Sequence, residues 1–537
     1  MKQLHSLYKR HKKIFLAAVF IAAFTAVIIS IFPVKQAFEY NPDEGRYLEV
    51  SSLYLKGFSL YNQIWFDQPP LFPLLLSFWL KLFGISLYHA RILVIIFSGL
   101  LIWAFYQTIK IDWGRFTALS ASVFLILSSS YLRLSASVML NLPALAFAMV
   151  SIYFLSLYRQ LQKKNLLLLS GIAMGLSLQI KLITLFLIPI IIAQIIYKKF
   201  SPLKNTRIPP GLSDIFIWVA GLLAAYAPIA LMFFHANPGL FTQQLIIPHI
   251  KSLDFSQDNL AILRKFILAD YDFLLLALLG IFIIIKQKKY LGLLPAAWLI
   301  FAFAILSKHQ PLWHHYYLLI SIPLSWLAAI ALNALFPAYK TDKGYPQKKF
   351  FSLLAAGLLL ITIARLPLKL NRTLQSLTEK NTTEQENLIL KSMAKYKDKT
   401  EWIFTDRPIF AIYADIPVPP ELALVTYKRS FSDQLTSNFL KKALEQYNPE
   451  QLLLNKLEFF SPETLFFIET RYTKIYADLI PKRIGEFHYK EFSLIERFLI
   501  KSLVKNYSTP FNVSKEYAPE KTSFTNITLY LRNDLTK

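Results

Sequence analysis

Long runs of apolar residues, separated by short polar connections, fill the chain up to about residue 367. A helix of roughly 20 apolar residues is long enough to cross the hydrocarbon core of a bilayer. The runs therefore predict about eleven membrane-spanning helices. They cover residues 14–33, 88–107, 116–134, 141–158, 166–180, 183–197, 213–234, 271–285, 290–307, 316–335 and 350–367, and the fifth and sixth form a short, tight pair.

The first long connection, residues 34–87, contains an apolar stretch of its own. Leu71–Phe83 is too short to be counted as a span. Its composition favours a helix that lies at the membrane surface or dips into it.

The pattern changes after residue 367, where charged residues and proline turns become frequent. Short apolar runs at Trp402–Phe404, Ala423–Val425 and Leu452–Leu454 alternate with helix-like stretches such as Ser432–Glu445. This alternation is typical of a small soluble α/β domain. The sequence thus predicts an α-helical, polytopic membrane domain over residues 1–367 and a soluble α/β domain over residues 368–537.

Composition agrees with a membrane protein. Hydrophobic residues make up 55% of the 537 residues, which is high for a soluble globular protein. No Asp or Glu occurs between Asp112 and Asp214, as expected where the chain lies in lipid. Cysteine is absent, which excludes disulfides and thiolate catalysis.

The net charge of +25 is compatible with nucleic-acid binding, but its distribution argues against that partner. The basic residues form short clusters between apolar runs, as the positive-inside rule describes for cytoplasmic loops. These clusters are Lys2–Lys13, Lys110 with Arg115, Arg159 with Lys163 and Lys164, Lys198–Arg207, Lys286–Lys289 and Lys340–Lys349. We expect a bilayer as partner, and no nucleic acid.

The same rule orients the chain. The first run follows a basic segment and lacks a small-residue cleavage site, so we expect an uncleaved signal anchor with a cytoplasmic N-terminus. An odd number of spans then places the C-terminal domain outside the cytoplasm. We predict a multi-pass protein of the cytoplasmic (inner) membrane, with that domain in the periplasm if the cell is Gram-negative.

The first outside loop carries candidate chemistry. It contains Asn41-Pro42-Asp43-Glu44-Gly45-Arg46-Tyr47 and later Trp65-Phe66-Asp67-Gln68-Pro69-Pro70. A carboxylate can deprotonate or orient an acceptor hydroxyl, and an arginine can grip a phosphate with two hydrogen bonds. The alternative is a solvated loop in which Pro-Asp-Glu begins a helix.

These motifs resemble the first extracytoplasmic loop of polyprenyl-phosphate-sugar glycosyltransferases of the GT-C class. That class includes the lipid A aminoarabinose transferases and the protein O-mannosyltransferases of glycosyltransferase family 39. The resemblance rests on Asp43-Glu44-x-Arg46-Tyr47, Asp67-x-Pro69-Pro70, Leu82-Phe83-Gly84 and Arg91. It implies a GT-C fold, catalytic carboxylates at Asp43 and Glu44, and a donor phosphate bound by Arg46. Tyr47 and Asp67 are expected to contact donor or acceptor.

Two positions depart from the pattern of the family. Gln68 stands where relatives commonly have Lys, so one cation for the phosphate must come from elsewhere. Between the third and fourth spans relatives commonly place an acid, and Asn141 stands closest to that position. An asparagine accepts a hydrogen bond but cannot act as a base, so we expect Asn141 to contact a substrate only.

Several later residues are further candidates. Lys308, His314 and His315 lie at a span end, where a cation and two imidazoles could bind the phosphate, although Lys and aromatic residues there also serve as interfacial anchors. Lys181 lies between the paired short spans, where it contacts a substrate or extends toward water.

The resemblance also implies a metal site. Some relatives hold a divalent ion near the donor phosphate, with ligands at positions that match Asp67 and His249. A carboxylate and an imidazole are suitable ligands for zinc, or magnesium in its place. We therefore expect a divalent metal at these two residues, which would offset the missing lysine at position 68.

The function expected from the sequence is a membrane glycosyltransferase. It would move a sugar from a polyprenyl-phosphate donor to a lipid, glycan or protein acceptor at the outer face, with inversion at the sugar. The alternative is a multi-span transporter or lipid flippase. Such proteins place ionisable groups at the bilayer midplane, whereas the acids here lie in predicted outside loops.

Overall fold

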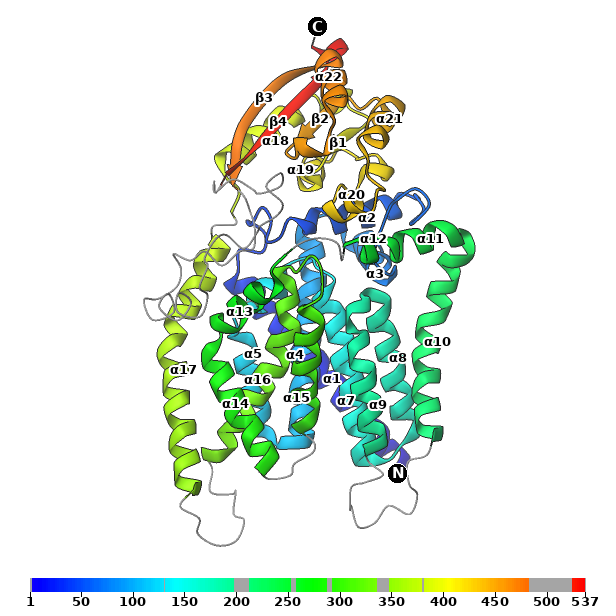
Figure 1. Cartoon of the computed structure of the whole chain (residues 1–537). Coiled ribbons are helices and arrows are strands. Elements are labelled where there is room, and N and C mark those ends of the chain that lie inside the picture. The colour runs from blue at the N-terminus through cyan, green and yellow to red at the C-terminus, as the bar shows by residue number, and fades with distance from the viewer. Residues whose placement is uncertain are drawn as a thin grey trace.

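The computed structural model describes residues 2–129, 131–197, 212–252, 257–286, 292–335, 347–378, 381–481 and 524–536. A bundle of helices carries a smaller domain at one end, and the two termini lie at opposite ends of the molecule (Figure 1). The predicted basic clusters Lys198–Arg207, Lys286–Lys289 and Lys340–Lys349 fall largely outside the described residues.

The bundle follows the predicted apolar runs. Its α-helices are α1 (Lys2–Ile31), α4 (Leu87–Trp113), α5 (Arg115–Ile126), α6 (Tyr131–Ala136), α7 (Asn141–Leu161), α8 (Lys164–Ile180), α9 (Leu187–Tyr197), α10 (Leu212–Ala236), α14 (Tyr271–Lys286), α15 (Leu293–Leu306), α16 (Leu318–Ala331) and α17 (Gln347–Thr378). Short 3-10 segments flank them: η1 (Leu182–Phe186), η5 (His314–Tyr317) and η6 (Leu332–Leu335).

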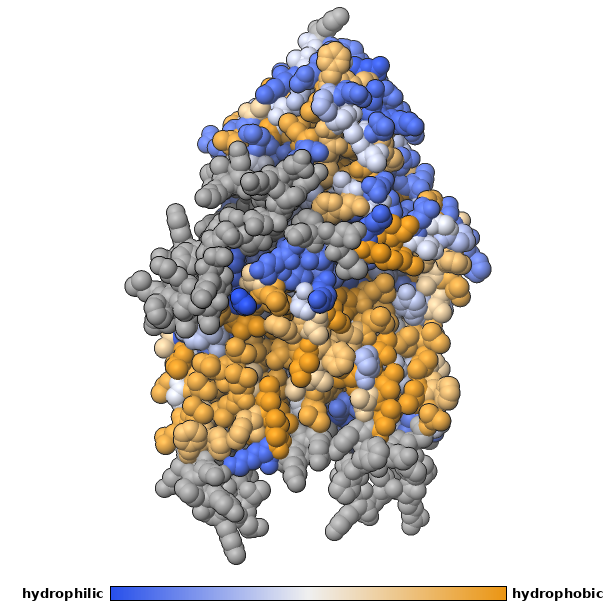
Figure 2. Space-filling view, in the orientation of Figure 1, coloured by the Kyte–Doolittle hydropathy of each residue, from blue (hydrophilic) through white to orange (hydrophobic). Residues whose placement is uncertain are grey.

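Among the described residues, four helices are individually long and apolar enough to cross a membrane, or five if the bent pair of α13 (Asn259–Ala269) and α14 counts as one span. The remaining apolar helices are shorter, with 10–17 residues each. Hydrophobic side chains cover the bundle, and mostly hydrophilic ones cover the domain above it (Figure 2). A broad exposed apolar surface of this kind indicates lipid contact, so the chain is a multi-pass membrane protein. The count of eleven spans stays a prediction.

Close helix packing holds α8 against α10. A Cβ added to Gly171 or Gly175 on α8 would lie 2.0 Å or 2.4 Å from carbonyl oxygens of α10. Gly221 on α10 is equally close to the Leu168 carbonyl, at 2.3 Å. Small residues spaced four apart let helix backbones approach in this way, which offsets the shorter apolar length of α8.

A layer of short helices lies between the bundle and the domain (Figure 1). It consists of α2 (Asp43–Leu55), α3 (Leu71–Phe83), α11 (Pro238–Leu245) and α12 (Ile247–Lys251). The predicted surface helix is α3, with the expected bounds. In the bundle below, α13 meets α14 at a bend of 87°; the sequence pattern had suggested only a connection before residue 271.

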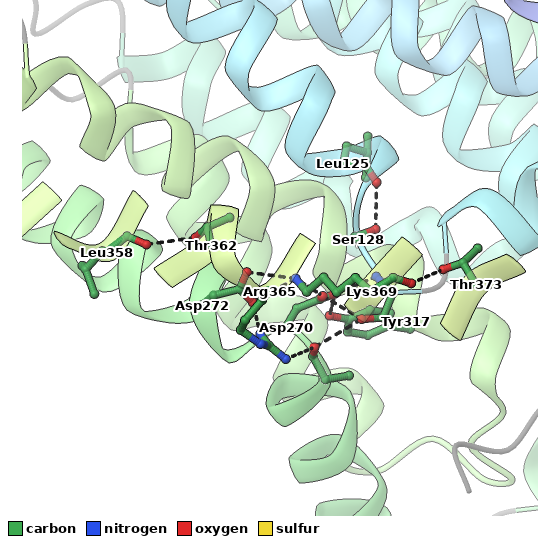
Figure 3. Close-up of polar contacts among 12 residues, drawn as sticks. Leu125, Ser128, Asp270, Asp272, Tyr317, Leu358, Thr362, Arg365, Lys369 and Thr373 are labelled. Carbon is green, nitrogen blue, oxygen red and sulfur yellow. Dashed lines mark hydrogen bonds and ion pairs between the residues drawn. The ribbon is translucent and has the colours of Figure 1, made fainter. Parts of the chain in front are cut away.

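Buried charges fix this bend to α17. Lys369 lies 2.7 Å from an oxygen of Asp270 and 2.9 Å from one of Asp272, and Arg365 also pairs with Asp272 (Figure 3). Tyr317 donates to Asp270 at 2.6 Å. Because an isolated buried charge is costly, this network holds α17 firmly at the outer end of the bundle. The helix continues past the predicted domain boundary at 367 as far as Thr378.

The C-terminal domain is a mixed α/β unit, as its sequence pattern predicts. Its four-stranded sheet has the order β1-β2-β4-β3, in which β1 and β2 are parallel and the other two pairs are antiparallel. The strands are β1 (Ile403–Thr405), β2 (Gln451–Leu454), β3 (Tyr472–Pro481) and β4 (Phe524–Arg532). The helices are α18 (Glu384–Ala394), α19 (Pro408–Ala414), α20 (Tyr427–Phe431), α21 (Ser437–Tyr447) and α22 (Pro462–Arg471), with short 3-10 turns η7 (Lys397–Lys399), η8 (Pro420–Leu422), η9 (Leu457–Phe459) and η11 (Asn533–Leu535).

Two of the three short apolar runs singled out in the sequence form strands, β1 and β2. The third, Ala423–Val425, forms an irregular connection between η8 and α20. Its side chains are buried all the same. Burial therefore explains the apolar run, and the run alone did not distinguish a buried connection from a strand.

Candidate active site

Asp43 and Arg46 lie on the first turn of α2, at the face of the bundle that the C-terminal domain covers. The Asn41 side chain accepts a hydrogen bond from the Asp43 backbone at 3.0 Å, which orders the start of the helix. Three residues apart on the helix, Asp43 and Arg46 form an ion pair. The Asp43 side chain remains 24% exposed, so a substrate can reach its carboxylate.

The Arg46 guanidinium keeps hydrogen-bonding capacity. One nitrogen pairs with Asp43, and a second lies 3.4 Å from the Val425 carbonyl of the C-terminal domain. Its Nε is buried and has no hydrogen-bond partner within the described parts of the chain. An unpaired buried donor is costly, so the Nε–H group has unused hydrogen-bonding capacity.

Glu44, the second predicted catalytic carboxylate, has a structural role instead. It is fully buried and pairs with Arg91 at 2.8 Å. Its oxygens also accept backbone hydrogen bonds from Tyr40 at 2.6 Å and Val138 at 2.9 Å. A carboxylate occupied in this way joins the first loop to α4 and to the segment before α7. The catalytic role expected for Glu44 stays a prediction, and this burial and pairing argue against it.

A second charged group lies around Asp67. The Lys428 ammonium, carried by α20 of the C-terminal domain, is 2.8 Å from Asp67 Oδ2 and 2.9 Å from His249 Nε2. Gln68 donates to the same Asp67 oxygen at 3.1 Å. The structure thus unites Asp67 with His249, as expected, but places a lysine between them.

The pKa values follow from these neighbours. Burial alone would raise the pKa of Asp67, but the charges of Lys428 and His249 and hydrogen bonds from Lys428 and Gln68 lower it to about 2. Burial, followed by the Lys428 charge, lowers the pKa of His249 to about 4. Near neutral pH, Asp67 is therefore ionised and His249 is a neutral acceptor for the Lys428 N–H.

The arrangement does not fit a metal ion. An ammonium lies within hydrogen-bond distance of both expected ligands, and a cation placed between them would meet it. In the parts of the chain that the structure describes, His, Asp and Glu side chains form no group of three or more able to hold a metal.

Lys181 and Asn141 form a third polar group, below the first two. Lys181 donates to Asn141 Oδ1 at 2.5 Å, and its ammonium lies 4.5 Å from the centre of the Tyr316 ring. Asn141 in turn donates to the His315 carbonyl at 3.0 Å. Lys181 follows α8 and precedes η1, where its charge interacts with those of Asp43, Asp67 and Lys428. The predicted contact residues are thus brought together with the acids.

Tyr47 connects the groups. Its ring packs edge-on against Phe66 and Phe72, with centroids 6.4 Å and 6.2 Å away. Burial and the charges of Asp43 and Asp67 raise the pKa of Tyr47 well above its usual range. The phenol is therefore neutral and can serve only as a hydrogen-bonding contact.

The predicted group of Lys308, His314 and His315 is divided. Lys308 is exposed in the turn after α15, and the next residue, His309, reaches the site instead. His309 packs on Tyr316 with 4.5 Å between ring centroids. Burial and the charges of Lys181, Lys428 and His249 lower its pKa to about 3.

The two histidines of η5 have different neighbours. The His315 ring packs on Tyr316 with 4.6 Å between ring centroids, and the Lys181 ammonium lies over the same Tyr316 ring. The His314 ring packs on Phe266 at 5.3 Å. Only His315 therefore belongs to the group around Lys181.

The C-terminal domain completes the site from above. Besides Lys428, it supplies Lys456, whose ammonium lies 4.2 Å from the centre of the Tyr427 ring. Burial and the nearby charge of Arg46 lower the pKa of Lys456 to about 8. Sequence reasoning missed Lys428, Lys456 and His309, because no spacing or motif distinguishes them from surface residues.

Close backbone contact holds this domain on α2. A Cβ added to Gly45 would lie 2.6 Å from the backbone nitrogen of Ile409 at the start of α19. The neighbouring Phe38 ring packs on Phe410 and Tyr413, with centroids 4.9 Å and 5.0 Å apart. Gly45 is thus required for docking rather than for chain flexibility.

Replacing Gly45 by Ala is expected to loosen the domain, because an added methyl group forces α2 and α19 apart. The cost of such overpacking is about 1–3 kcal/mol. We expect faster proteolysis between the two domains and reduced donor binding, with the bundle intact. As a control, Gly357→Ala, where an added Cβ meets nothing within 4 Å, should change neither. Equal protease resistance of Gly45→Ala and the parent protein would contradict the docking role.

Comparisons with known proteins identify a family and a fold that the chain is similar to. Residues 67–233 match the family described as dolichyl-phosphate-mannose-protein mannosyltransferase. The fold is similar to ArnT from Cupriavidus metallidurans bound to undecaprenyl phosphate, at 15% identity and a TM-score of 0.60, over 85% of this chain and 95% of that one. It is also similar to the apo oligosaccharyltransferase of Archaeoglobus fulgidus, at 12% identity and a TM-score of 0.52, over 86% of this chain and 73% of that one.

No sequence among curated proteins matches the chain. The resemblance to GT-C glycosyltransferases, first seen in the loop motifs, is confirmed by the family match and the shared fold.

Proposed function

We propose that this chain, which has the GT-C glycosyltransferase fold, transfers a sugar from a polyprenyl-phosphate donor to an acceptor at the outer face of the membrane. One observation carries the proposal: an accessible carboxylate, Asp43, lies in a group of cations. The cations are Arg46, Lys181, Lys428 and Lys456. Transfer from a lipid phosphate needs both kinds of group.

The chemistry assigns a role to each. The acceptor oxygen attacks the anomeric carbon while the bond from that carbon to the phosphate oxygen breaks, and attack from the opposite face inverts the sugar. Asp43 orients the acceptor hydroxyl and takes its proton. The leaving phosphate keeps the bonding electron pair, and its charge is stabilised by the Arg46 N–H groups and the ammonium groups around it. An acceptor that is itself a phosphate needs only positioning by Asp43.

The proposed partners follow from the same geometry. The donor is a polyprenyl-phosphate-linked sugar, and the ArnT structure with undecaprenyl phosphate supports a lipid phosphate as the leaving group. Lipid, glycan and protein acceptors all present a nucleophilic oxygen that Asp43 could orient. A comparison of the lipids and glycans of a deletion strain with those of its parent identifies the acceptor.

The assay is direct. The purified full-length protein is incubated with polyprenyl phosphate carrying a labelled sugar, and released polyprenyl phosphate is measured with and without acceptor fractions. We expect acceptor-dependent release. A protein that moves the intact donor across vesicle membranes without breaking it is a transporter or flippase, and that result would overturn the proposal.

Orientation in the cytoplasmic membrane is part of the proposal. The positive-inside distribution supports a cytoplasmic N-terminus, and the two termini lie at opposite ends of the fold. A reporter fused after Lys343 should read cytoplasmic, and one fused after Lys537 should read extracytoplasmic. The same side for both fusions would contradict this orientation.

Donor binding should weaken as the pH rises through about 7. Burial and the Lys428 charge lower the pKa of Lys181 to about 7, against the opposing influence of Asp67 and Asp43. The protonated, charged form of Lys181 therefore predominates below that pH and is lost above it. A sugar phosphodiester keeps its single charge over this range, so the change originates in the protein.

The measurement is the dissociation constant of the donor from pH 6 to 8.5. We expect a rise that begins above about pH 7, where Lys181 loses its proton, and steepens near pH 8, where Lys456 loses its own. Each lost proton contributes at most a tenfold rise per pH unit. His249 and His309, with pKa values of about 4 and 3, remain neutral throughout. Lys181→Gln should bind weakly with a flatter profile. A variant with the profile of the parent protein would exclude Lys181 as the titrating group.

A further inference from the structure

Lys428 holds an unusual position for a residue of the C-terminal domain. It lies on α20, about 180 residues from His249 and further from Asp67 in sequence, yet it hydrogen-bonds with both. The Asp67 and Lys428 side chains are only 18% and 19% exposed. Ion pairs between exposed, mobile side chains do not keep one geometry. Because Asp67 and Lys428 are largely buried, their ion pair holds the Lys428 ammonium in a defined position.

Neighbouring contacts fix α20 over the first loop. The Arg429 guanidinium stacks 5.2 Å from the Trp65 ring and donates to the Glu421 carbonyl at 2.6 Å. Gln434 accepts from the Trp65 indole at 2.6 Å and donates to the Gln243 carbonyl at 3.1 Å. These bonds join α20 to both the first loop and α11, so the position of Lys428 is defined by docking of the whole domain.

The ammonium has a donor to spare. It carries three N–H groups; within the described part of the chain, Asp67 and His249 account for two of them. His249, with a pKa of about 4, adds no positive charge. The remaining N–H can bind an anionic oxygen, and the adjacent Lys181 and Arg46 add further positive charge.

The neighbours of Lys428 explain two features of the sequence together. Gln68, next to Asp67, is uncharged. Among the described residues, Asp67 and His249 belong to no group of three or more His, Asp or Glu side chains that could hold a metal. We propose that Lys428 is the donor-phosphate cation at Asp67 and His249, in the place where a divalent ion would otherwise bridge them. This inference rests on the proposed function. It adds one point: the phosphate site is complete only when the C-terminal domain is docked on the first loop.

The first test measures binding of undecaprenyl phosphate to the purified full-length protein in metal-free buffer at fixed pH. Lys428→Met removes the charge and keeps the length of the side chain. A hydrogen bond between charged groups contributes roughly a ten- to hundredfold change in affinity, so we expect a loss of that size. Lys428→Arg should retain most of the binding. The control Lys442→Met, an exposed residue of α21 in the same domain, should match the parent protein.

The second test measures metal binding by the parent protein and by Lys428→Met. The parent protein is titrated with zinc and analysed for bound metal, and its melting temperature is recorded. We expect no stoichiometric zinc and full transfer activity after chelation. Lys428→Met, with Asp67 and His249 freed from the ammonium, should bind zinc more tightly than the parent protein does.

The outcomes separate the two proposals. Parent protein that does not bind undecaprenyl phosphate overturns the proposed function, and this inference with it. If the parent protein and Lys428→Met bind the lipid equally well, only the proposed role of Lys428 is overturned. One zinc per chain that is lost in His249→Ala would show that a metal occupies the site, and would also overturn it. If Lys428→Met does not fold, Lys428→Arg and the zinc analysis of the parent protein decide.

Discussion

Replacing Asp43 by Asn is expected to lower the rate of sugar transfer by about a hundred- to ten-thousandfold, the usual contribution of a positioned acid or base. Asparagine keeps the size of the side chain and can still accept a hydrogen bond from Arg46, but it does not take a proton from the acceptor. Because Asp43 is partly exposed and lies at the start of α2, the substitution should leave the fold unchanged.

Single-turnover rates and melting temperatures measured on the same samples test this expectation. Asp398→Asn, at an exposed position of the C-terminal domain, serves as the control and should behave as the parent protein. Binding of the donor should change little, so the loss should appear in the rate of the chemical step. Near-normal turnover in Asp43→Asn would remove this residue from the mechanism. An effect at the lower end of the range indicates a phosphate acceptor, for which a base is unnecessary.

Replacing Glu44 by Ala should have a different and equally large effect. The change leaves the Arg91 guanidinium buried without its carboxylate, because both side chains are almost fully inaccessible. Removing one partner of a buried ion pair costs about 3–5 kcal/mol, and the backbone N–H groups of Tyr40 and Val138 lose their acceptor as well. We expect a large drop in melting temperature and in the yield of folded protein.

The matched variant Glu44→Gln keeps one acceptor oxygen and should lose less stability. A further control, Glu469→Ala, alters an exposed residue of α22 and should melt with the parent protein. If Glu44→Ala retained its melting temperature and lost only transfer activity, the catalytic role expected from the sequence would be restored. Together, these variants distinguish the roles of the two adjacent carboxylates. The Asp43 variant should lose turnover, and the Glu44 variant should lose stability.

Helix geometry explains why the sequence did not separate these two carboxylates. Adjacent residues on a helix point about 100° apart. At the start of α2 this rotation turns Asp43 toward Arg46 and Glu44 into the contact with Arg91 on α4. In η5 the rings of His314 and His315 likewise have different partners, Phe266 and Tyr316. A motif places residues along the chain, but it does not specify the direction of each side chain.

The sequence alone determined the membrane-embedded helices and the general character of the C-terminal domain. Hydropathy is a local property that sums over roughly 20 neighbouring residues, so α4, α7 and α10 could be predicted closely. The surface helix α3 and the strands β1 and β2 followed from equally local patterns. The Asp43–Arg46 ion pair could also be predicted from the sequence, because residues three apart on a helix are neighbours.

The tertiary structure alone decided which distant groups meet. The bend between α13 and α14 depends on a buried charge network that α17 supplies. Lys428 resembles any surface lysine in the sequence, and it becomes a group of the site only because Gly45 and Trp65 let the C-terminal domain settle on the first loop. Contacts between segments hundreds of residues apart depend on the fit of whole surfaces. A local sequence pattern cannot predict this fit, because the packing energy depends on the shapes of both contacting surfaces and not on either segment alone.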